Sequence, residues 1–319
     1  MARIFSTYPW TRPTWRCRAD VLESDLSGFR RLLGTLRALK SYDVLVLDGF
    51  ERGDLVAAAV VARMLRPPRV IILDPTWKLD GSPVARRATR AIVSALDGAH
   101  VTYGVLSRFE VDSFPKTWGV SANRVVFLPW HFDLSEDELR TPSSTNGPFF
   151  AGGDSLRDYG TALAAAAHVP ARLVIATRAM PANGVSIPAN VTVGPESRQQ
   201  YDLLLREAIA VVLPLEVRAD RSSGQGTLLN AMAHGKTVIV TDSPGVRDYL
   251  RPNETALVVS PGDPAALRAA MQWVLDHPDE SGRIARNARK DVLTRFGPDL
   301  YLQRLVDLID GQTSQWFGT

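Results

Sequence analysis

Cysteine is almost missing from this 319-residue chain, in which Cys17 stands alone. A single cysteine excludes an internal disulfide and a zinc site built from several thiolates, and it is typical of a reducing compartment. Long apolar runs are also missing: the stretch from Leu55 to Ala62 ends at Arg63, far short of the ~20 residues that span a membrane. No apolar signal segment follows Met1. These absences predict a cytoplasmic protein without a transmembrane helix.

A surplus of one charge is lacking as well. The chain has 37 basic and 34 acidic residues, which leaves a net charge of +3. Up to Thr145 there are 20 basic and 16 acidic residues (+4), and after it 17 and 18 (−1). This balance excludes the clustered basicity of a nucleic-acid binder. The five histidines show no metal-ligand spacing, so we expect no bound metal.

What is present is a regular alternation of short β-branched runs and helical patterns, which is typical of α/β domains with parallel sheets. We expect strands at 3–7, 43–48, 69–74, 100–106, 124–128, 148–151, 171–177, 190–193, 209–213, 237–241 and 256–259. We expect helices at 25–40, 54–66, 84–96, after Ser107, and at 158–168, 197–207, 226–234, 264–276, 280–294 and 298–309.

A polar segment from Ser135 to Pro148 contains the strongest turn cluster of the chain, and we interpret it as a linker. It predicts two doubly wound, Rossmann-like domains, at 1–145 and 146–319, facing each other across a cleft. The last helix is expected to pack back on the N-terminal domain. Ligands of such sheets bind beyond the carboxyl ends of the strands.

The most informative motif is a run of small residues between a strand and a helix. Open backbone N–H groups at a helix N-terminus bind anions such as a diphosphate, and nearby hydroxyls can add donors. The alternative is a flexible turn with hydroxyl caps. The residues concerned are Ser222, Ser223, Gly224, Gln225, Gly226 and Thr227.

The surroundings of that motif resemble a known family. The run from Gly224 to Asp242, then the segments starting at Pro244 and Asn253, closely resemble the donor-sugar domain of family 4-like glycosyltransferases with the GT-B fold (glycosyl transferases group 1). The resemblance implies transfer of a sugar from a UDP- or GDP-sugar to a glycan, lipid or small-molecule acceptor. It also implies a second domain that binds the donor, a first domain that binds the acceptor, a retaining reaction, and no metal or further cofactor.

The family's donor site has a pair of glutamates, and these positions fall here on Ser222 and Asn230. The resemblance places the second of them on the ribose hydroxyls, where an amide still donates and accepts hydrogen bonds. The first would lie near the sugar ring, where serine reaches less far. Glu216, in the loop before Ser222, could replace that carboxylate or could be an exposed loop residue.

The family also places an arginine and a lysine on the donor phosphates. Gly153 occupies the arginine position, and Arg157 falls at or near the lysine position. An arginine fork suits a diphosphate and would stabilise the charge on the leaving group, although an ion pair with Asp154 or Asp158 is the alternative. The backbone of Gly152 and Gly153 would give a ligand close access, and Gly194 and Glu196 lie where the family binds the base.

The acceptor side is less defined. Asp74 ends a predicted strand and is our candidate for acceptor binding or for a catalytic base. The alternative is that Asp74 caps the following turn. Asp48 ends a second predicted strand. The segment with Trp10 and Trp15 could form a sugar-stacking wall or pack as a flap. The helix with the basic residues Arg30, Arg31, Arg37 and Lys40 is either a solvated face or a peripheral contact with the cytoplasmic face of a membrane.

Three classes of function are compatible with the sequence. The first is a retaining, metal-independent glycosyltransferase. The second is an inactive nucleotide-sugar-binding or scaffold protein of the same fold, and the third is an epimerase or hydrolase of nucleotide sugars. A serine hydrolase is disfavoured because the chain has no G-x-S-x-G elbow.

Overall fold

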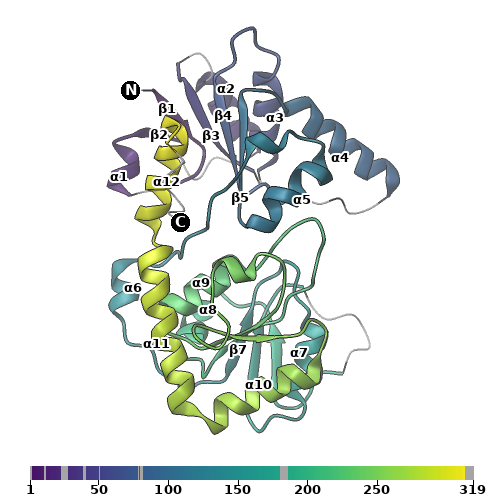
Figure 1. Cartoon of the computed structure of the whole chain (residues 1–319), viewed down its shortest axis with the longest axis vertical. Coiled ribbons are helices and arrows are strands. Elements are labelled where there is room, and N and C mark those ends of the chain that lie inside the picture. Colours follow the sequence, from purple (N-terminus) through teal and green to yellow (C-terminus); the bar gives the residue numbers. More distant parts are fainter. Residues whose placement is uncertain are drawn as a thin grey trace. The chain divides into compact units, whose positions relative to one another are not determined.

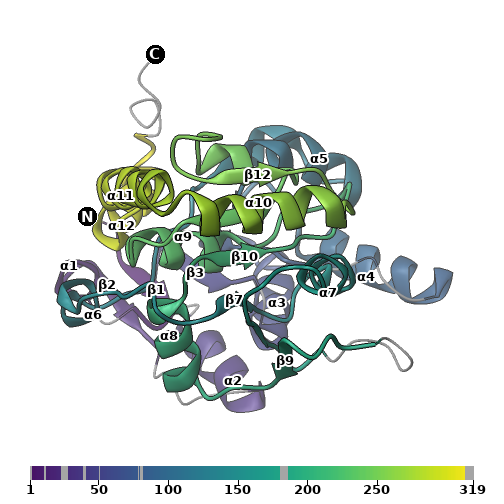
Figure 2. The same cartoon turned by 90° about the horizontal axis from the view of Figure 1, so that it is seen from below.

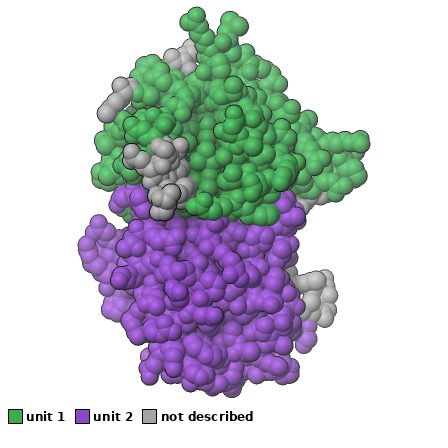
Figure 3. Space-filling model, in the orientation of Figure 1, with its two compact units in different colours: residues 1–129, 301–319 green, residues 130–300 purple. Residues whose placement is uncertain are grey.

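The computed structural model describes residues 2–10, 12–22, 28–38, 41–49, 51–77, 79, 82–179 and 186–312. The chain divides into two compact units, which Figure 3 colours separately. Unit 1 consists of residues 1–129 and 301–319, and unit 2 of residues 130–300. The sequence predicts a domain boundary near residue 145, whereas in the structure residues 130–145 belong to unit 2.

Each unit is built around one parallel six-stranded sheet (Figure 1). Unit 1 has the strand order β2-β1-β3-β4-β5-β6, and unit 2 has the order β12-β11-β10-β7-β8-β9. The strands of unit 1 are β1 (Ile4–Ser6), β2 (Ala19–Val21), β3 (Val44–Asp48), β4 (Arg69–Leu73), β5 (Val101–Val105) and β6 (Val125–Phe127). Those of unit 2 are β7 (Phe149–Gly152), β8 (Leu173–Ala176), β9 (Val191–Gly194), β10 (Val211–Leu213), β11 (Val238–Thr241) and β12 (Leu257–Val259).

Helices connect the strands and cover the sheets. The first part of the chain has α1 (Pro13–Arg16), α2 (Gly28–Ala38), α3 (Arg52–Val61), α4 (Pro83–Leu96), α5 (Arg108–Trp118) and the short η1 (Ala122–Arg124). Then follow α6 (Glu136–Arg140), α7 (Tyr159–Ala166), α8 (Arg198–Glu207), α9 (Gln225–Ala233), η2 (Val246–Asp248), α10 (Pro264–Asp276), α11 (Pro278–Arg295) and α12 (Pro298–Asp310). In unit 2, α7 packs on α10 and α9 on α11, and the second pair lies side by side in Figures 1 and 2.

The α/β fold with two doubly wound sheets is as predicted, and the central strands explain why the sequence specifies it. Val44 to Leu47 in β3 and Val211 to Leu213 in β10 are at most 1% exposed. Strands buried on both faces consist of apolar residues without polar alternation, and parallel pairing with helical crossovers follows from that composition. In each unit, buried apolar side chains of the strands and of the covering helices pack together in one hydrophobic core.

Two local predictions need correction. The polar segment after Ser135 is not simply a linker, because it contains α6. The Ser135 hydroxyl accepts from the N–H of Glu138, whose carboxylate accepts from the N–H of Ser135, which forms a capping box. Such reciprocal caps satisfy two free donors and allow a short, highly charged helix to form.

The aromatic segment near the N-terminus is the second case, since it contains α1 and leads into the edge strand β2. Trp10 and Trp15 are 8% and 0% exposed and meet edge to face at 5.4 Å between ring centroids. Trp10 also packs on Tyr301 of α12, within unit 1. These two indoles belong to the core, so they do not form a sugar-stacking wall.

Candidate functional site

The candidate site of unit 2 lies where the direction of chain connection reverses within the sheet. From β7 the chain continues to β8 and β9 on one side, whereas β10 lies on the other side and continues to β11 and β12. Ligands of doubly wound sheets bind at this switch point, beyond the carboxyl ends of the two central strands. Here those ends are Gly152 of β7 and Leu213 of β10, which are followed by the loops that carry Arg157 and Ser222.

Gly152 and Gly153 are required by close packing at the end of β7. A Cβ atom on Gly152 would lie 2.5 Å from the ring of Tyr201. Gly153 has φ +110°, and a Cβ there would lie 2.7 Å from Nη2 of Arg157. Only glycine adopts that conformation without strain, and it leaves room for the guanidinium beside the backbone.

Arg157 is the centre of the site. Its Nε donates to the Gly152 carbonyl at 3.0 Å, and its Nη1 donates to the Ser155 carbonyl at 2.6 Å. The outer edge of the fork meets two hydroxyls: Nη1 lies 3.3 Å from Ser223 Oγ, and Nη2 lies 3.2 Å from Thr227 Oγ1. Two loops from different strands are thereby joined through one guanidinium.

The ion pair that we considered for Arg157 is not formed. The Asp154 carboxylate instead binds Arg178, whose Nε lies 2.9 Å away, and hydrogen bonds from the Arg178 backbone and neighbouring side chains lower the Asp154 pKa to about 2. Asp158 caps α7 by accepting from the N–H of Thr161 at 3.0 Å. Among the described residues no carboxylate lies within ion-pair distance of Arg157, and burial lowers the pKa of its guanidinium. The geometry therefore leaves a positive charge for which the described residues supply no counter-ion.

The loop before α9 contacts this guanidinium through the Ser223 hydroxyl. Gly224 is the N-cap of α9, with φ +94°, and the helix begins at Gln225. The first N–H groups of a helix have no partner within the helix and carry partial positive charge. Thr227, in the first turn, contributes the hydroxyl that meets Arg157.

Other predicted members of this loop have structural partners. Ser222 is buried, and its Oγ accepts a hydrogen bond from Nε2 of the buried Gln225 at 2.7 Å. This buried hydrogen bond stabilises the loop. Gly226 lies near Trp130, since a Cβ atom on Gly226 would lie 4.0 Å from Nε1 of Trp130. Asn230, one turn further along α9, accepts at Oδ1 from the backbone N–H of Asp133 at 2.7 Å. That bond fixes the amide, and its Nδ2 donors are the part left to contact a ligand.

A cavity of about 430 Å³ adjoins Gly153 on the β8 and β9 side of the switch point. Its other lining residues include Thr177, Arg178, Glu196 and Tyr201. Glu196 is exposed, and Gly194 ends β9 close by with no atom within 4 Å of its Cβ position. The predicted residues Gly153 and Glu196 thus share one cavity, next to the Arg157 fork.

Two tyrosines that we did not predict complete the site. The Tyr159 hydroxyl donates to the Gly153 carbonyl at 2.6 Å, and burial raises the pKa of Tyr159 to about 12. The Tyr201 hydroxyl lies 3.5 Å from Thr227 Oγ1, and burial raises the pKa of Tyr201 as well. Both hydroxyls remain protonated at neutral pH, so they can act only as neutral hydrogen-bonding groups.

Unit 1 has a corresponding switch point between β1 and β3, where a buried polar network lies. Arg31 donates to both carboxylate oxygens of Asp54, at 3.0 and 2.9 Å, and to the Thr7 carbonyl at 2.9 Å. Asp54 is fully buried, and its Oδ2 also accepts from the Asp48 N–H at 3.1 Å. The network anchors Asp48 at the end of β3.

This network corrects our interpretation of the first basic helix. Arg31 is 7% exposed and faces inward, because the buried Asp54 carboxylate needs a counter-ion. Arg30 and Arg37 are exposed, whereas Lys40 lies outside the described residues.

Asp74 lies one strand away from the switch point of unit 1, directly after β4. Its φ is +45°, an uncommon conformation for a residue with a Cβ. Its N–H donates to the Gly104 carbonyl at 3.0 Å, and the next turn is held by the Trp77 indole, which donates to the Gly49 carbonyl at 2.7 Å. Such backbone strain is concentrated at functional sites, which makes Asp74 a candidate worth testing.

The side chains of Glu216 and His131 form none of the hydrogen bonds described above. Glu216 is exposed, and only its backbone N–H bonds to the loop of Arg157, through the Leu156 carbonyl. His131 is buried, with Nδ1 2.8 Å from the Phe132 carbonyl. Within the described part of the chain, no group of three or more histidine, cysteine or acidic residues could hold a metal ion. No described helix is both long enough and apolar enough to cross a bilayer.

Comparison with known proteins now identifies this arrangement. A family model described as "Glycosyl transferases group 1" matches residues 182–291. The matched segment lies within unit 2, and the chain is similar to that family over these residues. The GT-B resemblance predicted from the sequence is confirmed by this match and by the two parallel six-stranded sheets that the fold requires.

Among curated proteins, the D-rhamnosyltransferase WbpZ of Pseudomonas aeruginosa is 37% identical over 86 residues. The matched segment is 27% of this chain and 22% of WbpZ, so the chain matches only about a fifth of that relative's length.

Two solved structures show the same GT-B fold over nearly the whole chain. Anabaena HepE in complex with UDP-glucose has a TM-score of 0.73 at 13% identity, covering 98% of this chain and 100% of HepE. Sucrose-phosphate synthase of Thermosynechococcus elongatus has a TM-score of 0.67 at 19% identity, covering 96% of this chain and 88% of the synthase.

Proposed function

We propose that this group 1 chain is a glycosyltransferase that takes a sugar from a nucleotide-diphosphate sugar. The observation that carries the proposal is the convergence of Arg157, Ser223 and Thr227 at the N-terminus of α9, with no carboxylate among the described residues paired to the guanidinium. A diphosphate matches this set, because a guanidinium fork, two hydroxyls and free backbone N–H groups all donate to anionic oxygens.

The donor's nucleoside is proposed to occupy the cavity beside Gly153, with Glu196 and Gly194 near the base. A UDP- or GDP-sugar is the proposed donor, and the complex of HepE with UDP-glucose supports the first of these. The ribose would contact Asn230, whose Nδ2 donors are left for a ligand because the Asp133 N–H occupies its oxygen.

For the chemical step, Arg157 is proposed to stabilise the negative charge that develops on the leaving diphosphate. A fixed cation beside a helix N-terminus supplies that stabilisation without a metal ion. We therefore propose a metal-independent reaction, and from the family resemblance a retaining one. Unit 1 is proposed to bind a glycan, lipid or small-molecule acceptor, with Asp74 as the candidate base and the chain located in the cytoplasm or on the cytoplasmic face of a membrane.

A specific observation supports a second candidate, a binding protein without transfer activity. The family's glutamate positions carry Ser222 and Asn230, and both of these side chains are engaged within the protein. A third candidate, an epimerase or hydrolase of nucleotide sugars, would need only the same donor site.

One experiment separates these candidates. The purified chain is tested by thermal shift against UDP-, GDP-, ADP- and dTDP-sugars, and the donor that stabilises it is then incubated with EDTA, with and without an acceptor extract. A transferase consumes the donor only when the acceptor is present and retains the anomeric configuration in the NMR spectrum of the product. Stabilisation without turnover supports the binding protein, and turnover without acceptor supports the hydrolase or epimerase. The donor-site proposal is wrong if no nucleotide sugar stabilises the chain.

A further inference from the structure

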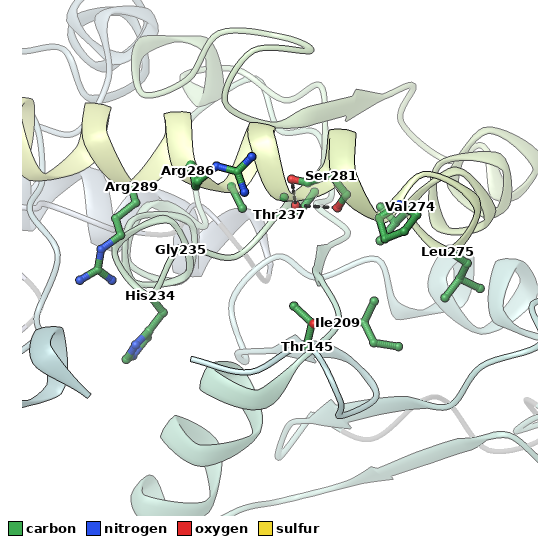
Figure 4. Close-up of a pocket in the computed structure, with 13 residues that line it drawn as sticks. Thr145, Ile209, His234, Gly235, Thr237, Val274, Leu275, Ser281, Arg286 and Arg289 are labelled. Atoms are coloured by element: carbon green, nitrogen blue, oxygen red, sulfur yellow. Dashed lines mark hydrogen bonds between the residues drawn. The ribbon is translucent and has the colours of Figure 1, made fainter. Parts of the chain in front are cut away.

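Unit 2 contains a second cavity, of about 480 Å³, whose lining residues are drawn in Figure 4. Ile209 and Thr237, which line it, come just before β10 and β11. Because all strands of the sheet are parallel, their amino ends lie at the edge away from the Gly152 backbone and the Arg157 fork. This cavity is therefore separate from the candidate donor site.

The wall of the cavity is mainly apolar. Ile209, Val274 and Leu275 contribute aliphatic side chains, which Figure 4 shows around the space below α11. The two buried hydroxyls of the lining, on Thr237 and Ser281, satisfy each other, with 2.8 Å between Thr237 Oγ1 and Ser281 Oγ. An apolar surface with few unsatisfied polar groups suits a hydrocarbon chain.

Positive charge is concentrated on one side of this cavity, where α11 carries Arg286 and Arg289. None of the lining residues is acidic. Burial lowers the pKa of His234, which also lines the cavity, to about 4, so that side chain is neutral at physiological pH and adds no charge. The charge of the lining is therefore that of the two arginines.

The two arginines differ in what they bind. Arg289 donates to the carbonyl of Ala233, the last residue of α9, and to that of Leu139 at 2.6 Å, so its guanidinium is used within the fold. No described residue forms a hydrogen bond or ion pair with the exposed guanidinium of Arg286. The Arg286 guanidinium lies close to Gly282, one turn earlier on α11, since a Cβ there would be in tight contact with Arg286 Nη1 at 3.2 Å.

We propose that this cavity binds a small amphiphilic anion, a molecule with an aliphatic chain and one carboxylate or phosphate head group. The chain would lie against Ile209, Val274 and Leu275, and the head group would pair with Arg286. A volume of about 480 Å³ falls in the range of ~300–1,000 Å³ that is usual for small-molecule sites. The bound molecule would contact the carboxyl end of α9, whose amino end carries Thr227. This site does not depend on the proposed transferase activity.

The test is isothermal titration of the full chain with octanoate and with octyl phosphate, both below their micelle concentrations. We expect saturable binding with one site per chain for both probes, and at least tenfold weaker binding of octanol and of inorganic phosphate. The pair of charged probes also shows whether a carboxylate or a phosphate is preferred.

Three variants assign the binding to this cavity. Arg286→Gln is expected to weaken octanoate binding at least tenfold, whereas Arg283→Gln, an equal change of charge at an exposed position of the same helix, is expected to leave it unchanged. Gly282→Leu places a side chain beside Arg286 while favouring the helix, so it is expected to abolish binding in a folded protein. The proposal is wrong if neither charged probe saturates, if octanol binds as tightly as octanoate, or if Arg286→Gln and Gly282→Leu both bind as the unchanged chain does.

Discussion

Nη2 of Arg157 lies 3.2 Å from Oγ1 of Thr227, so the loop after β7 meets the first turn of α9 through a single hydrogen bond. The same guanidinium reaches Ser223 and returns to the carbonyl of Gly152. This side chain is one of several links between the two loops, which are also joined by the Arg221 guanidinium on Ser155 Oγ at 2.8 Å. Changing Arg157 tests the donor site directly.

Replacing Arg157 with alanine is expected to weaken binding of the donor diphosphate about 10- to 100-fold, from the ~1.5–3 kcal/mol of a hydrogen bond to a charged group. Transfer should fall further, by about 100-fold or more in kcat/KM, because the developing charge on the leaving group loses its cation. Titration calorimetry with the nucleoside diphosphate and initial rates measure the two effects. Arg140→Ala, which removes an exposed guanidinium paired with Glu136 in α6, is the matched control and should change neither tenfold.

Replacing Gly153 with alanine is expected to destabilise the chain by about 1–3 kcal/mol, the usual cost of forcing a side chain into a disfavoured backbone region. The new Cβ would also displace the Arg157 guanidinium, so nucleotide affinity should fall with stability. Gly194→Ala is the control, because that residue has space around its Cβ position. Equal urea midpoints for the two variants would contradict this prediction.

The buried pair in unit 1 gives a prediction about stability alone. Asp54→Ala leaves the Arg31 guanidinium buried without its partner, which is expected to cost about 3–5 kcal/mol in urea unfolding. Asp43→Ala removes an ion pair whose side chains are 66% and 57% exposed, so it should cost less than about 1 kcal/mol. The double replacement Arg31→Met with Asp54→Leu should cost less than the sum of the single changes, because no charge is left buried.

His234 predicts how stability depends on pH. Burial lowers its folded-state pKa to about 4, against about 6.5 when unfolded, so the unfolded chain binds the proton first as the pH falls. Its contribution to stability is therefore full above pH ~6.5 and is lost between about 6.5 and 4, up to about 3 kcal/mol in all. Unfolding free energies across this window should lose part of their slope in His234→Gln, and an unchanged slope would contradict this prediction. The folded-state pKa of Lys236, lowered by burial to about 8, is too high to affect this window.

Most strands and most helix starts could be predicted because the information is local, whereas the short edge strand β2 was missed. Val44 to Leu47 form an uninterrupted apolar run, and Ser107 and Ser197 are side-chain caps directly before α5 and α8. The same reasoning missed α6, because its signal is the Ser135–Glu138 capping box rather than an apolar face. A charged segment without apolar spacing was interpreted as a linker.

The candidate site was predicted in part. Gly153, Arg157 and Thr227 are brought together as the motif suggested, although nothing in the spacing shows that Arg157 would have no acidic partner. Tyr201 could not have been predicted, since its contacts with Gly152 and Thr227 join three segments that are distant in sequence. Arg31 and Asp54 were missed for a related reason: amphipathic patterns place charges on the surface, and only the tertiary structure shows a pair that satisfies itself in the interior.

The helix α12 has a consequence for the order in which this chain can fold during synthesis. Unit 2 is continuous in sequence, whereas unit 1 needs residues from both ends of the chain. Until the last part of α12 has left the ribosome, Trp10 lacks the ring of Tyr301, and Arg69 lacks the Ile309 carbonyl, to which its Nη1 donates at 2.6 Å. The first segment of unit 1 is thus synthesised before unit 2, but unit 1 is completed after it. Unit 1 therefore remains incomplete in the nascent chain while unit 2 folds.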